Sequence, residues 1–139
     1  MKLEQFFQEF DGLEPRERLE LLLEFSETLP ELSGERAAVP VPRQCRIVEC
    51  QTPVDLWVDV VEGTVRLEAV VPRQSPMVRG LVALLIEGID GATPDEVLDM
   101  PDDVLAPLGL AGVLGMVRQR GARGLVATIK RRTAAATSA

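Results

Sequence analysis

The chain has 139 residues and a formal net charge of −7, with 46% hydrophobic and 27% charged residues. This length suffices for one hydrophobic core, and the composition is typical of a globular chain rather than a disordered one. The acidic balance argues against nucleic-acid binding, which requires a basic surface. No apolar stretch is long enough to span a membrane, and the start of the chain lacks the basic and apolar segments of a signal peptide. We therefore expect a single domain over residues 1–139 that is cytoplasmic and binds neither nucleic acid nor membrane.

Residue types that are missing exclude several kinds of site. The chain has no histidine and two cysteines, so neither a Ser-His-Asp nor a Cys-His catalytic site can form within it. Two cysteines alone do not supply the usual closed zinc site or a four-thiolate iron–sulfur site. A glycine-rich phosphate-binding loop is absent as well. The sequence therefore predicts no metal site and no bound cofactor, and two thiols that a reducing cytoplasm keeps free.

Residues 1–30 are expected to form two leading helices. A short helix covers about Leu3 to Phe10. In the stretch PRERLELLLEFSETL, Pro15 suits the first turn of a second helix, and apolar positions recur on one face. That face holds Leu19, Leu22, Leu23 and Ser26. The prolines and the glycine of the next stretch, PELSGERAAVPVPRQ, predict a linker over the surface.

Residues 45–72 carry the clearest pattern of the chain, that of an antiparallel hairpin. Apolar and polar residues alternate in two runs that are separated by a two-residue turn at Glu62 and Gly63. The apolar positions are Val54, Leu56, Val58 and Val60 in the first run and Val65, Leu67, Ala69 and Val71 in the second. This turn sets Asp59 opposite Arg66, a favourable cross-strand charge pair. The segment from Cys45 to Glu49 is expected to add a third, shorter strand.

Residues 75–132 are expected to be helical. Ser75 can cap a helix that runs from Pro76 to about Asp90, and this helix is apolar on nearly all sides, as in a helix buried against a sheet. Thr93 and Glu96 match the pattern of a capping box, and PDDVLAPLG is expected to form one more helical turn. Helices, an antiparallel sheet and further helices, in this order, predict an α+β fold.

The end of the chain is basic. The last expected helix covers about Gly121 to Arg132, before a frayed end at residues 133–139. Residues 118–132 hold six basic residues and no acid. We interpret residues 130–132 as a solvated helix face, because cations are favoured near a helix C-terminus. Arg120 and Arg123 are interpreted as surface charges too.

Cys50 lies in the stretch VECQTPV, at the start of the first strand. Pro53 prevents regular strand pairing there, which predicts a loop at the rim of the sheet and a thiol that solvent can reach. Its reactivity depends on the thiolate fraction, which Arg46 would raise and which Glu49 and Asp55 would lower. A lone cysteine is also commonly a small buried hydrophobic residue. The residues alone leave both interpretations open.

Four segments of the chain resemble the SufE family of sulfur-acceptor proteins, over about residues 12–132. RLELLLEFSETLPEL is similar to the leading helix of the family, and VECQTPV to its reactive-cysteine loop. SPMVRGLVALLIEGIDGATPDEVL is similar to the central helix and the turn after it. LGL, followed by RQRGARGLVATIKR, resembles the closing helix. The order and spacing of the four segments make the resemblance fairly specific.

The chain departs from the family pattern at a few positions around these segments. Glu49 replaces a glycine, Thr52 replaces a serine, and Asp55 stands where tryptophan is common, with Trp57 two residues later. Arg120 stands where asparagine is common. These changes affect the shape of the loop and leave the cysteine in place.

The resemblance implies a SufE/NifU-like α+β fold, with a small antiparallel sheet packed against helices. It also implies a carrier and activator rather than an enzyme. Cys50 would take sulfur from the persulfide of a pyridoxal-phosphate cysteine desulfurase of the SufS type and pass it to iron–sulfur scaffold proteins. Gln51 would shape the cysteine loop, and Arg118 would be the arginine of the closing motif. Such a transfer resembles thiol–disulfide exchange and needs neither histidine nor metal.

Other interpretations stay open at this point. One is an iron–sulfur scaffold of the NifU or IscU type. Another is a thiol oxidoreductase in which Cys45 resolves Cys50, although their spacing is not that of a CxxC motif. Cys45 can instead share the buried face of Ile47. Arg118 can be a surface charge at a helix start, and both a monomer and a homodimer are compatible with the sequence.

Overall fold

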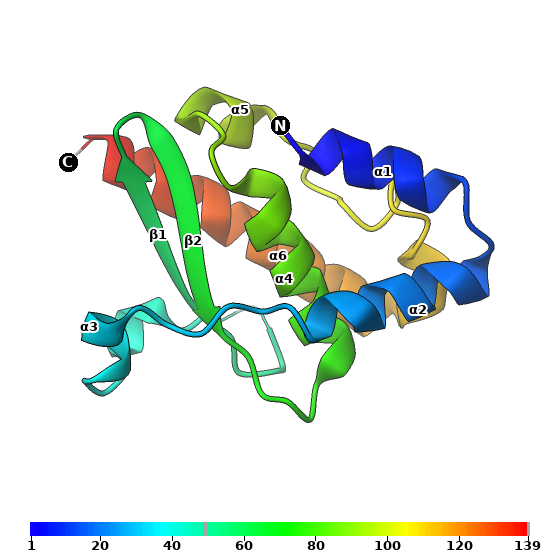
Figure 1. Ribbon diagram of the computed structural model, residues 1–139, viewed down its shortest axis with the longest axis horizontal. Helices are drawn as coiled ribbons and strands as arrows, with labels where there is room; N and C mark the ends of the chain where they lie inside the picture. Colours follow the sequence, from blue (N-terminus) through cyan, green and yellow to red (C-terminus); the bar gives the residue numbers. More distant parts are fainter. Residues whose placement is uncertain (49, 139) are drawn as a thin grey trace.

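The computed structural model of the protein describes residues 1–48 and 50–138. Helices come first and last along the chain, and a two-stranded antiparallel sheet lies between them (Figure 1). The α-helices are α1 (Leu3–Asp11), α2 (Pro15–Ser26), α3 (Gly34–Ala37), α4 (Pro76–Ile89), α5 (Pro94–Asp99) and α6 (Ala111–Ser138). A 3-10 turn, η1 (Arg43–Cys45), precedes the strands β1 (Asp55–Val61) and β2 (Thr64–Val70). The α+β fold class that the sequence predicts is confirmed.

The β1–β2 hairpin has the predicted register, with Asp59 opposite Arg66. Glu62 and Gly63 have φ angles of 52° and 78°. Two successive positive φ angles give the two-residue turn whose twist matches that of the flanking strands. One face of the hairpin is buried, at Leu56, Val65, Leu67 and Ala69.

The third strand expected before Cys50 is wrong for the residues that are described. Residues 43–45 form η1 instead, and Arg46 makes an isolated bridge to Asp55. The next pair, Ile47 and Val54, keeps one hydrogen bond. The pair after it would place Val48 opposite Pro53, which has no N–H group to donate, so the pairing ends there. Glu49 lies outside the described residues.

Helix α4 is the centre of the core, as its apolar sequence predicts. Residues 80–86 are all buried. A Cβ atom at Gly80 would lie 2.2 Å from the main-chain oxygen of Leu22, so α2 and α4 approach each other backbone to backbone. At the other end of α4, Gly88 lies against Leu3 of α1. The two leading helices therefore pack along one side of α4.

The helix starts differ from each other in their caps. Thr93 and Glu96 form the predicted capping box of α5, in which each side chain accepts a hydrogen bond from the other's main-chain N–H. The Ser75 side chain makes no capping bond to any described residue, so that expectation is wrong. The segment PDDVLAPLG forms turns rather than the expected helix, and Gly109 within it has a φ of 69°.

Helix α6 is longer than the sequence predicts. It begins ten residues before Gly121 and is kinked at Gly115, where φ is 81° and ψ is 168°. The expected frayed end is wrong for residues 133–138, which continue the helix. Thr133 is buried and its hydroxyl donates to the carbonyl four residues before it, and the alanines that follow favour a helix. Ala139 lies outside the described residues.

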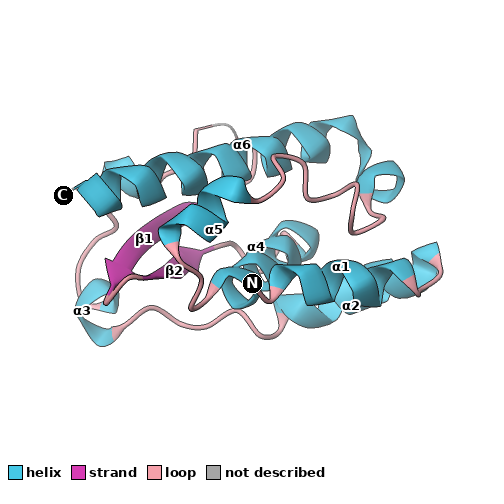
Figure 2. Ribbon diagram, turned by 90° about the horizontal axis from the view of Figure 1, so that it is seen from above, coloured by secondary structure: helices cyan, strands magenta, loops and turns pink. Residues whose placement is uncertain are grey.

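The elements are arranged in layers (Figure 2). Helix α6 runs along one side of the molecule, the leading helices lie on the other side, and the hairpin and α4 lie between them. The stretch expected as a surface linker carries α3, whose Arg36 binds Asp59 and Glu68 of the hairpin. Across the described ranges, no helix combines the length and the apolar character that a membrane crossing requires.

Candidate functional site

The loop that carries Cys50 has two ends that are held together. The Ile47 N–H donates to the Val54 carbonyl at 2.9 Å. Beside this bond, the Arg46 guanidinium donates to the buried Asp55 carboxylate, also at 2.9 Å. We call residues 44–47 and 54–56 the loop base, and residues 48 and 50–53 the loop tip. Because Arg46 is paired at the base, its charge is already matched by a carboxylate rather than available to the thiol.

Arg132 of α6 also holds the loop base. Its Nη1 donates to the Cys45 carbonyl at 3.0 Å and to the Leu56 carbonyl, and its Nη2 donates to the carbonyls of Gln44 at 2.9 Å and Arg46 at 3.3 Å. The interpretation of residues 130–132 as a solvated face is therefore wrong for Arg132. Lys130 departs from it as well, since it binds the Met100 carbonyl and an aspartate. The acceptors of Arg132 are main-chain carbonyls, which every residue type has, so no sequence pattern identifies this contact.

The Cys50 thiol lies against helix α6. The side chain is half-buried, and its Sγ donates a hydrogen bond to the Gly121 carbonyl at an Sγ···O distance of 3.6 Å. Only a protonated sulfur can donate such a bond. This contact suits the protonated thiol, and a thiolate would lose it.

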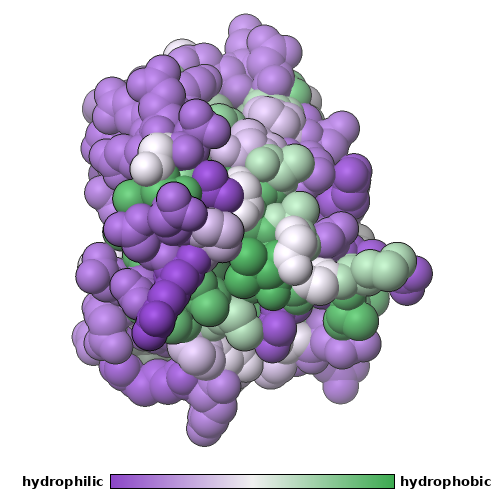
Figure 3. Space-filling view, turned by 90° about the vertical axis from the view of Figure 1, so that its right-hand side faces the viewer, coloured by the Kyte–Doolittle hydropathy of each residue, from purple (hydrophilic) through white to green (hydrophobic). Residues whose placement is uncertain are grey.

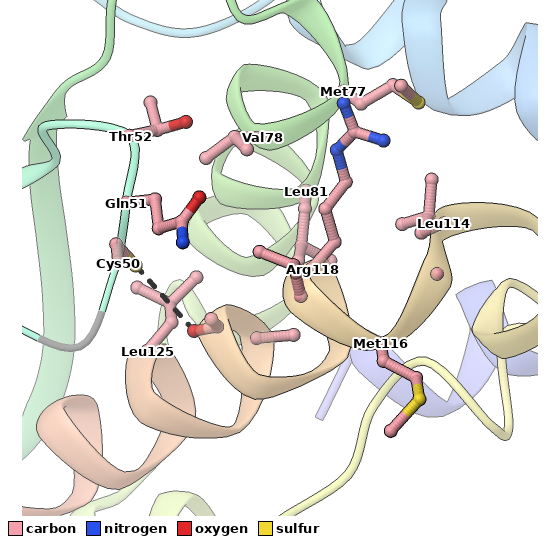
Figure 4. Close-up of a pocket in the computed structure, with 14 residues that line it drawn as sticks. Cys50, Gln51, Thr52, Met77, Val78, Leu81, Leu114, Met116, Arg118 and Leu125 are labelled. Atoms are coloured by element: carbon pink, nitrogen blue, oxygen red, sulfur yellow. Dashed lines mark hydrogen bonds between the residues drawn. The ribbon is translucent and has the colours of Figure 1, made fainter.

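A pocket of about 440 Å³ lies beside Cys50, between the loop tip, the start of α4 and the kinked part of α6 (Figure 4). Its wall is mostly apolar, and it is made by Met77, Val78, Leu81, Leu114, Met116, Val117, Ala122 and Leu125. Pockets of this size and character hold small molecules or inserted side chains. The reactive sulfur candidate thus faces a preformed apolar space.

The three residues singled out from the sequence line this pocket together: Cys50, Gln51 and Arg118. Figure 4 shows the Arg118 side chain rising from α6 towards Met77, across the pocket from Cys50. Arg118 is exposed, and within the described part of the chain it makes no hydrogen bond or ion pair. A guanidinium in this position is available to an anion or to a carboxylate of a partner.

Cys45 lies in the opposite environment. It lies in the loop base and is 7% exposed, and Ile47 is buried as well. Burial raises the pKa of the Cys45 thiol above its ordinary value of 9.0, and the nearby Arg132 guanidinium lowers it only in part. A raised pKa means less thiolate at neutral pH, so Cys45 is poorly suited to resolve a bond at Cys50.

The rim of the pocket exposes apolar side chains. At the start of α6, Val113, Met116 and Val117 are 38%, 71% and 56% exposed. Figure 3 shows hydrophobic side chains gathered in a band on the face to which this part of α6 belongs, with hydrophilic ones on both sides. Arg118 and Arg120 are exposed on the same turns of α6. Contiguous exposed apolar surface of this kind typically marks an interaction site.

The arrangement offers a thiol, a pocket and a cation, and it suits nucleophilic sulfur chemistry at Cys50. Among residues 1–48 and 50–138, no three Cys, Asp or Glu side chains are grouped so that they could hold a metal ion. The chemistry that these residues can perform themselves is attack by a thiolate on another sulfur atom.

Comparisons with known proteins place the chain among domains associated with Fe-S metabolism. The family model for SufE, the Fe-S metabolism associated domain, matches residues 3–133. Two uncharacterized SufE-like proteins from strains of Mycobacterium tuberculosis are each 36% identical over 134 residues, which cover 94% of this chain and 90% of each relative. A chloroplastic quinolinate synthase of Nicotiana tabacum is also 36% identical over 115 residues, although these make up only 15% of that protein.

The fold has a match among solved structures as well. The solution structure of a hypothetical protein from Thermus thermophilus superimposes with a TM-score of 0.85 and 30% sequence identity. The match covers 99% of this chain and 97% of that one. The family match over nearly the whole chain and the matching fold agree with the resemblance of the four sequence segments, and the chain belongs to the SufE family.

Proposed function

We propose that the protein is a cytoplasmic sulfur acceptor that receives the persulfide sulfur of a cysteine desulfurase on Cys50. The observation that carries this proposal is the placement of Cys50, half-buried at the tip of a loop and facing the apolar pocket. Membership of a family associated with Fe-S metabolism supports the pathway. The sulfur then passes to a scaffold protein of iron–sulfur cluster assembly.

The transfer is an exchange between sulfur atoms. The Cys50 thiol loses its proton, and its thiolate attacks the outer sulfur of the donor persulfide. A new S–S bond forms to Cys50 while the S–S bond in the donor breaks. The donor thiolate leaves and can take up the proton, so that no oxidant or reductant is consumed. Before this step the Cys50 thiol has to leave the Gly121 carbonyl, which accepts the hydrogen bond of the protonated sulfur.

The desulfurase is proposed to dock on the rim of the pocket. The exposed side chains of Val113, Met116 and Val117 supply apolar contact area, and Arg118 supplies a cation beside it. This part of the surface is basic although the chain as a whole is acidic. An acidic and apolar segment of the partner would fit it, and Gln51 would orient the loop tip for the transfer.

The experiment that tests the proposal measures the turnover of a purified cysteine desulfurase of the SufS type, with cysteine as substrate. Addition of the protein should raise alanine formation, because removal of the persulfide frees the enzyme for its next turnover. Cys45→Ser should stimulate as the wild type does, and Cys50→Ser should not stimulate. Equal stimulation by both variants would exclude Cys50 as the acceptor.

The two alternative functions have readouts of their own. An iron–sulfur scaffold would need ligands from more than one chain, and it would show visible absorbance after reconstitution with iron and sulfide. A thiol oxidoreductase would reduce the disulfides of insulin. The raised pKa of Cys45 disfavours the second alternative, because a resolving cysteine has to reach its thiolate form readily.

A further inference from the structure

The proposed sulfur transfer gives no role to the contacts that Arg132 makes. It lies on α6, far along the chain from the loop, and its guanidinium donates four hydrogen bonds to main-chain carbonyls on both sides of Cys50. Three of these carbonyls precede the loop tip, at residues 44–46, and the fourth follows it, at Leu56. A guanidinium has five N–H groups in a rigid planar fork, and four hydrogen bonds are made by its two Nη atoms. Arg132 thus ties together the two chain segments that the loop connects.

Helix α6 touches the loop at two separate levels. Arg132 holds the base, and the Gly121 carbonyl receives the Cys50 thiol at the tip. The two residues are 11 positions apart, which is three helical turns and about 16 Å, so they lie on the same face of α6. Because the two contacts are distinct, the tip can leave Gly121 while the base stays attached to α6.

A fixed base limits where the sulfur can go. Cys50 is four residue steps along the chain from Arg46, and four steps span at most about 14 Å when fully extended. If the base were loose, the sulfur could sample a larger volume and would spend less time at the position that a docked donor requires. Sulfur transfer needs the two sulfur atoms close together and aligned, and small misplacements in such reactions cost much of the rate.

We infer that Arg132 is a positioning residue for sulfur transfer at Cys50, which fixes the loop base on α6 so that the loop tip alone moves. The inference rests on the proposed function. The ion pair between Arg46 and Asp55 and the Ile47–Val54 hydrogen bond complete the same base. Arg132 touches neither of the reacting sulfur atoms, and its effect passes through the main chain of residues 44–46 and 56.

The test compares Arg132→Ala with Arg131→Ala, which removes the same charge from the neighbouring position of α6. Arg131 is exposed and donates to Thr128 of its own helix. With a cysteine desulfurase as donor, Arg132→Ala should lower the maximal rate of persulfide formation on Cys50 by about tenfold. The concentration at half-maximal rate should change little, because the rim of the pocket is intact. Arg132→Lys keeps the charge and loses the planar fork, so its maximal rate should lie between that of Arg132→Ala and that of the wild type.

Two further readouts need no sulfur donor and separate this inference from the proposed function. The amide of Ile47 should exchange with solvent much faster in Arg132→Ala, because its bond to Val54 closes the base. Alkylation of Cys45, which is buried within the base, should also become faster, while circular dichroism shows a folded protein. If wild-type Cys50 takes up no sulfur, the proposed function fails, and these two readouts still test the base.

Arg132→Lys covers the case in which Arg132→Ala does not fold. Wild-type amide exchange at Ile47 and a wild-type transfer rate in either folded Arg132 variant would overturn the inference. Equal losses in Arg131→Ala and Arg132→Ala would overturn it too, because the effect would then belong to the charge of α6 rather than to the base.

Discussion

Cys45 in the loop base and Cys50 in the loop tip are five residues apart, and the base and the tip differ in almost every physical respect. At the base, Ile47 and Val54 are 1% and 0% exposed, and main-chain and side-chain hydrogen bonds join it to α6 and β1. At the tip, Val48 is 89% exposed, and the half-buried Cys50 donates to the Gly121 carbonyl of α6 beside the pocket. The Cys45 sulfur is buried within the base, and Cys50 is half-buried at the edge of the pocket.

Under the proposed function, this contrast lets a small chain present a reactive sulfur without giving up a stable core. A thiol that must meet another protein has to be reachable, and a thiol that must not react elsewhere has to be sheltered. The loop meets both needs because hydrogen bonds hold its ends while its tip leaves Cys50 half-buried at the pocket.

Alkylation in the native state should separate the two cysteines most strongly. Cys45 can react only when the structure opens locally, and burial raises its pKa, so its thiolate fraction at any pH up to about 9 is smaller than that of an ordinary thiol. At neutral pH we expect Cys50 to be alkylated at least about a hundredfold faster than Cys45. The rate at Cys45 should keep rising as the pH passes 9.0.

Mass spectrometry of alkylated peptides measures the two rates separately, and an unfolded sample in denaturant supplies the control in which both cysteines react. Similar alkylation rates for the two cysteines in the native state would contradict the difference between the loop base and the loop tip.

Truncation of a base residue should cost far more stability than truncation of a tip residue. Ile47→Ala removes a fully buried side chain and should lower the free energy of unfolding by about 2–5 kcal/mol. Val48→Ala changes the neighbouring, exposed position and should stay within about 0.5 kcal/mol of the wild type. Urea denaturation of both variants measures the difference, and comparable losses would mean that the base is not part of the core.

Arg118 should matter to the partner and not to the fold. Our proposal has it contact the desulfurase at the rim of the pocket, so Arg118→Ala should raise the KM for the protein in the desulfurase assay by up to about tenfold. Its melting temperature should be unchanged, since the guanidinium is exposed.

Arg120→Ala is the matched control for Arg118→Ala, because Arg120 is exposed on the same helix and does not line the pocket. Equal effects of the two substitutions would point to general charge attraction instead of a contact by Arg118.

Gly121→Ala should have the smallest effect. A Cβ atom there would lie 4.0 Å from the Cys50 sulfur, which is an ordinary contact distance. Alanine favours a helix over glycine by about 1 kcal/mol, so the protein should be slightly more stable by thermal unfolding. Cys50 should remain reactive, and complete protection of it from alkylation would show that the thiol is packed more tightly against α6 than this geometry describes.

Much of this fold follows from its sequence because the relevant signals are local. The register of the hairpin comes from the alternation of apolar residues and from the Glu62–Gly63 turn, and the capping box of α5 comes from Thr93 and Glu96. The start of α6 is hidden by glycines that weaken the helical pattern. Its end is hidden because the burial of Thr133 depends on packing and not on the neighbouring residues.

Only part of the candidate site can be predicted from local sequence signals. Cys50 and Gln51 belong to one recognisable stretch, and Arg118 is identified by its resemblance to a family motif. The sequence pattern assigns Arg132 to solvent, because a charge near the end of a helix usually is solvated. Its acceptors are main-chain oxygens 76 to 88 residues away along the chain, which every residue type can supply. Only the folded chain reveals such a contact.

The central claim is that Cys50 is the sulfur that accepts a persulfide sulfur. The most direct measurement is intact-protein mass spectrometry after the protein is mixed with a cysteine desulfurase and cysteine, alongside Cys45→Ser and Cys50→Ser. The account predicts the mass of one added sulfur atom on the wild type and on Cys45→Ser, its removal by a reductant, and none on Cys50→Ser. An added sulfur that persists in Cys50→Ser, or none on the wild type while the same desulfurase loads an authentic acceptor, would contradict it.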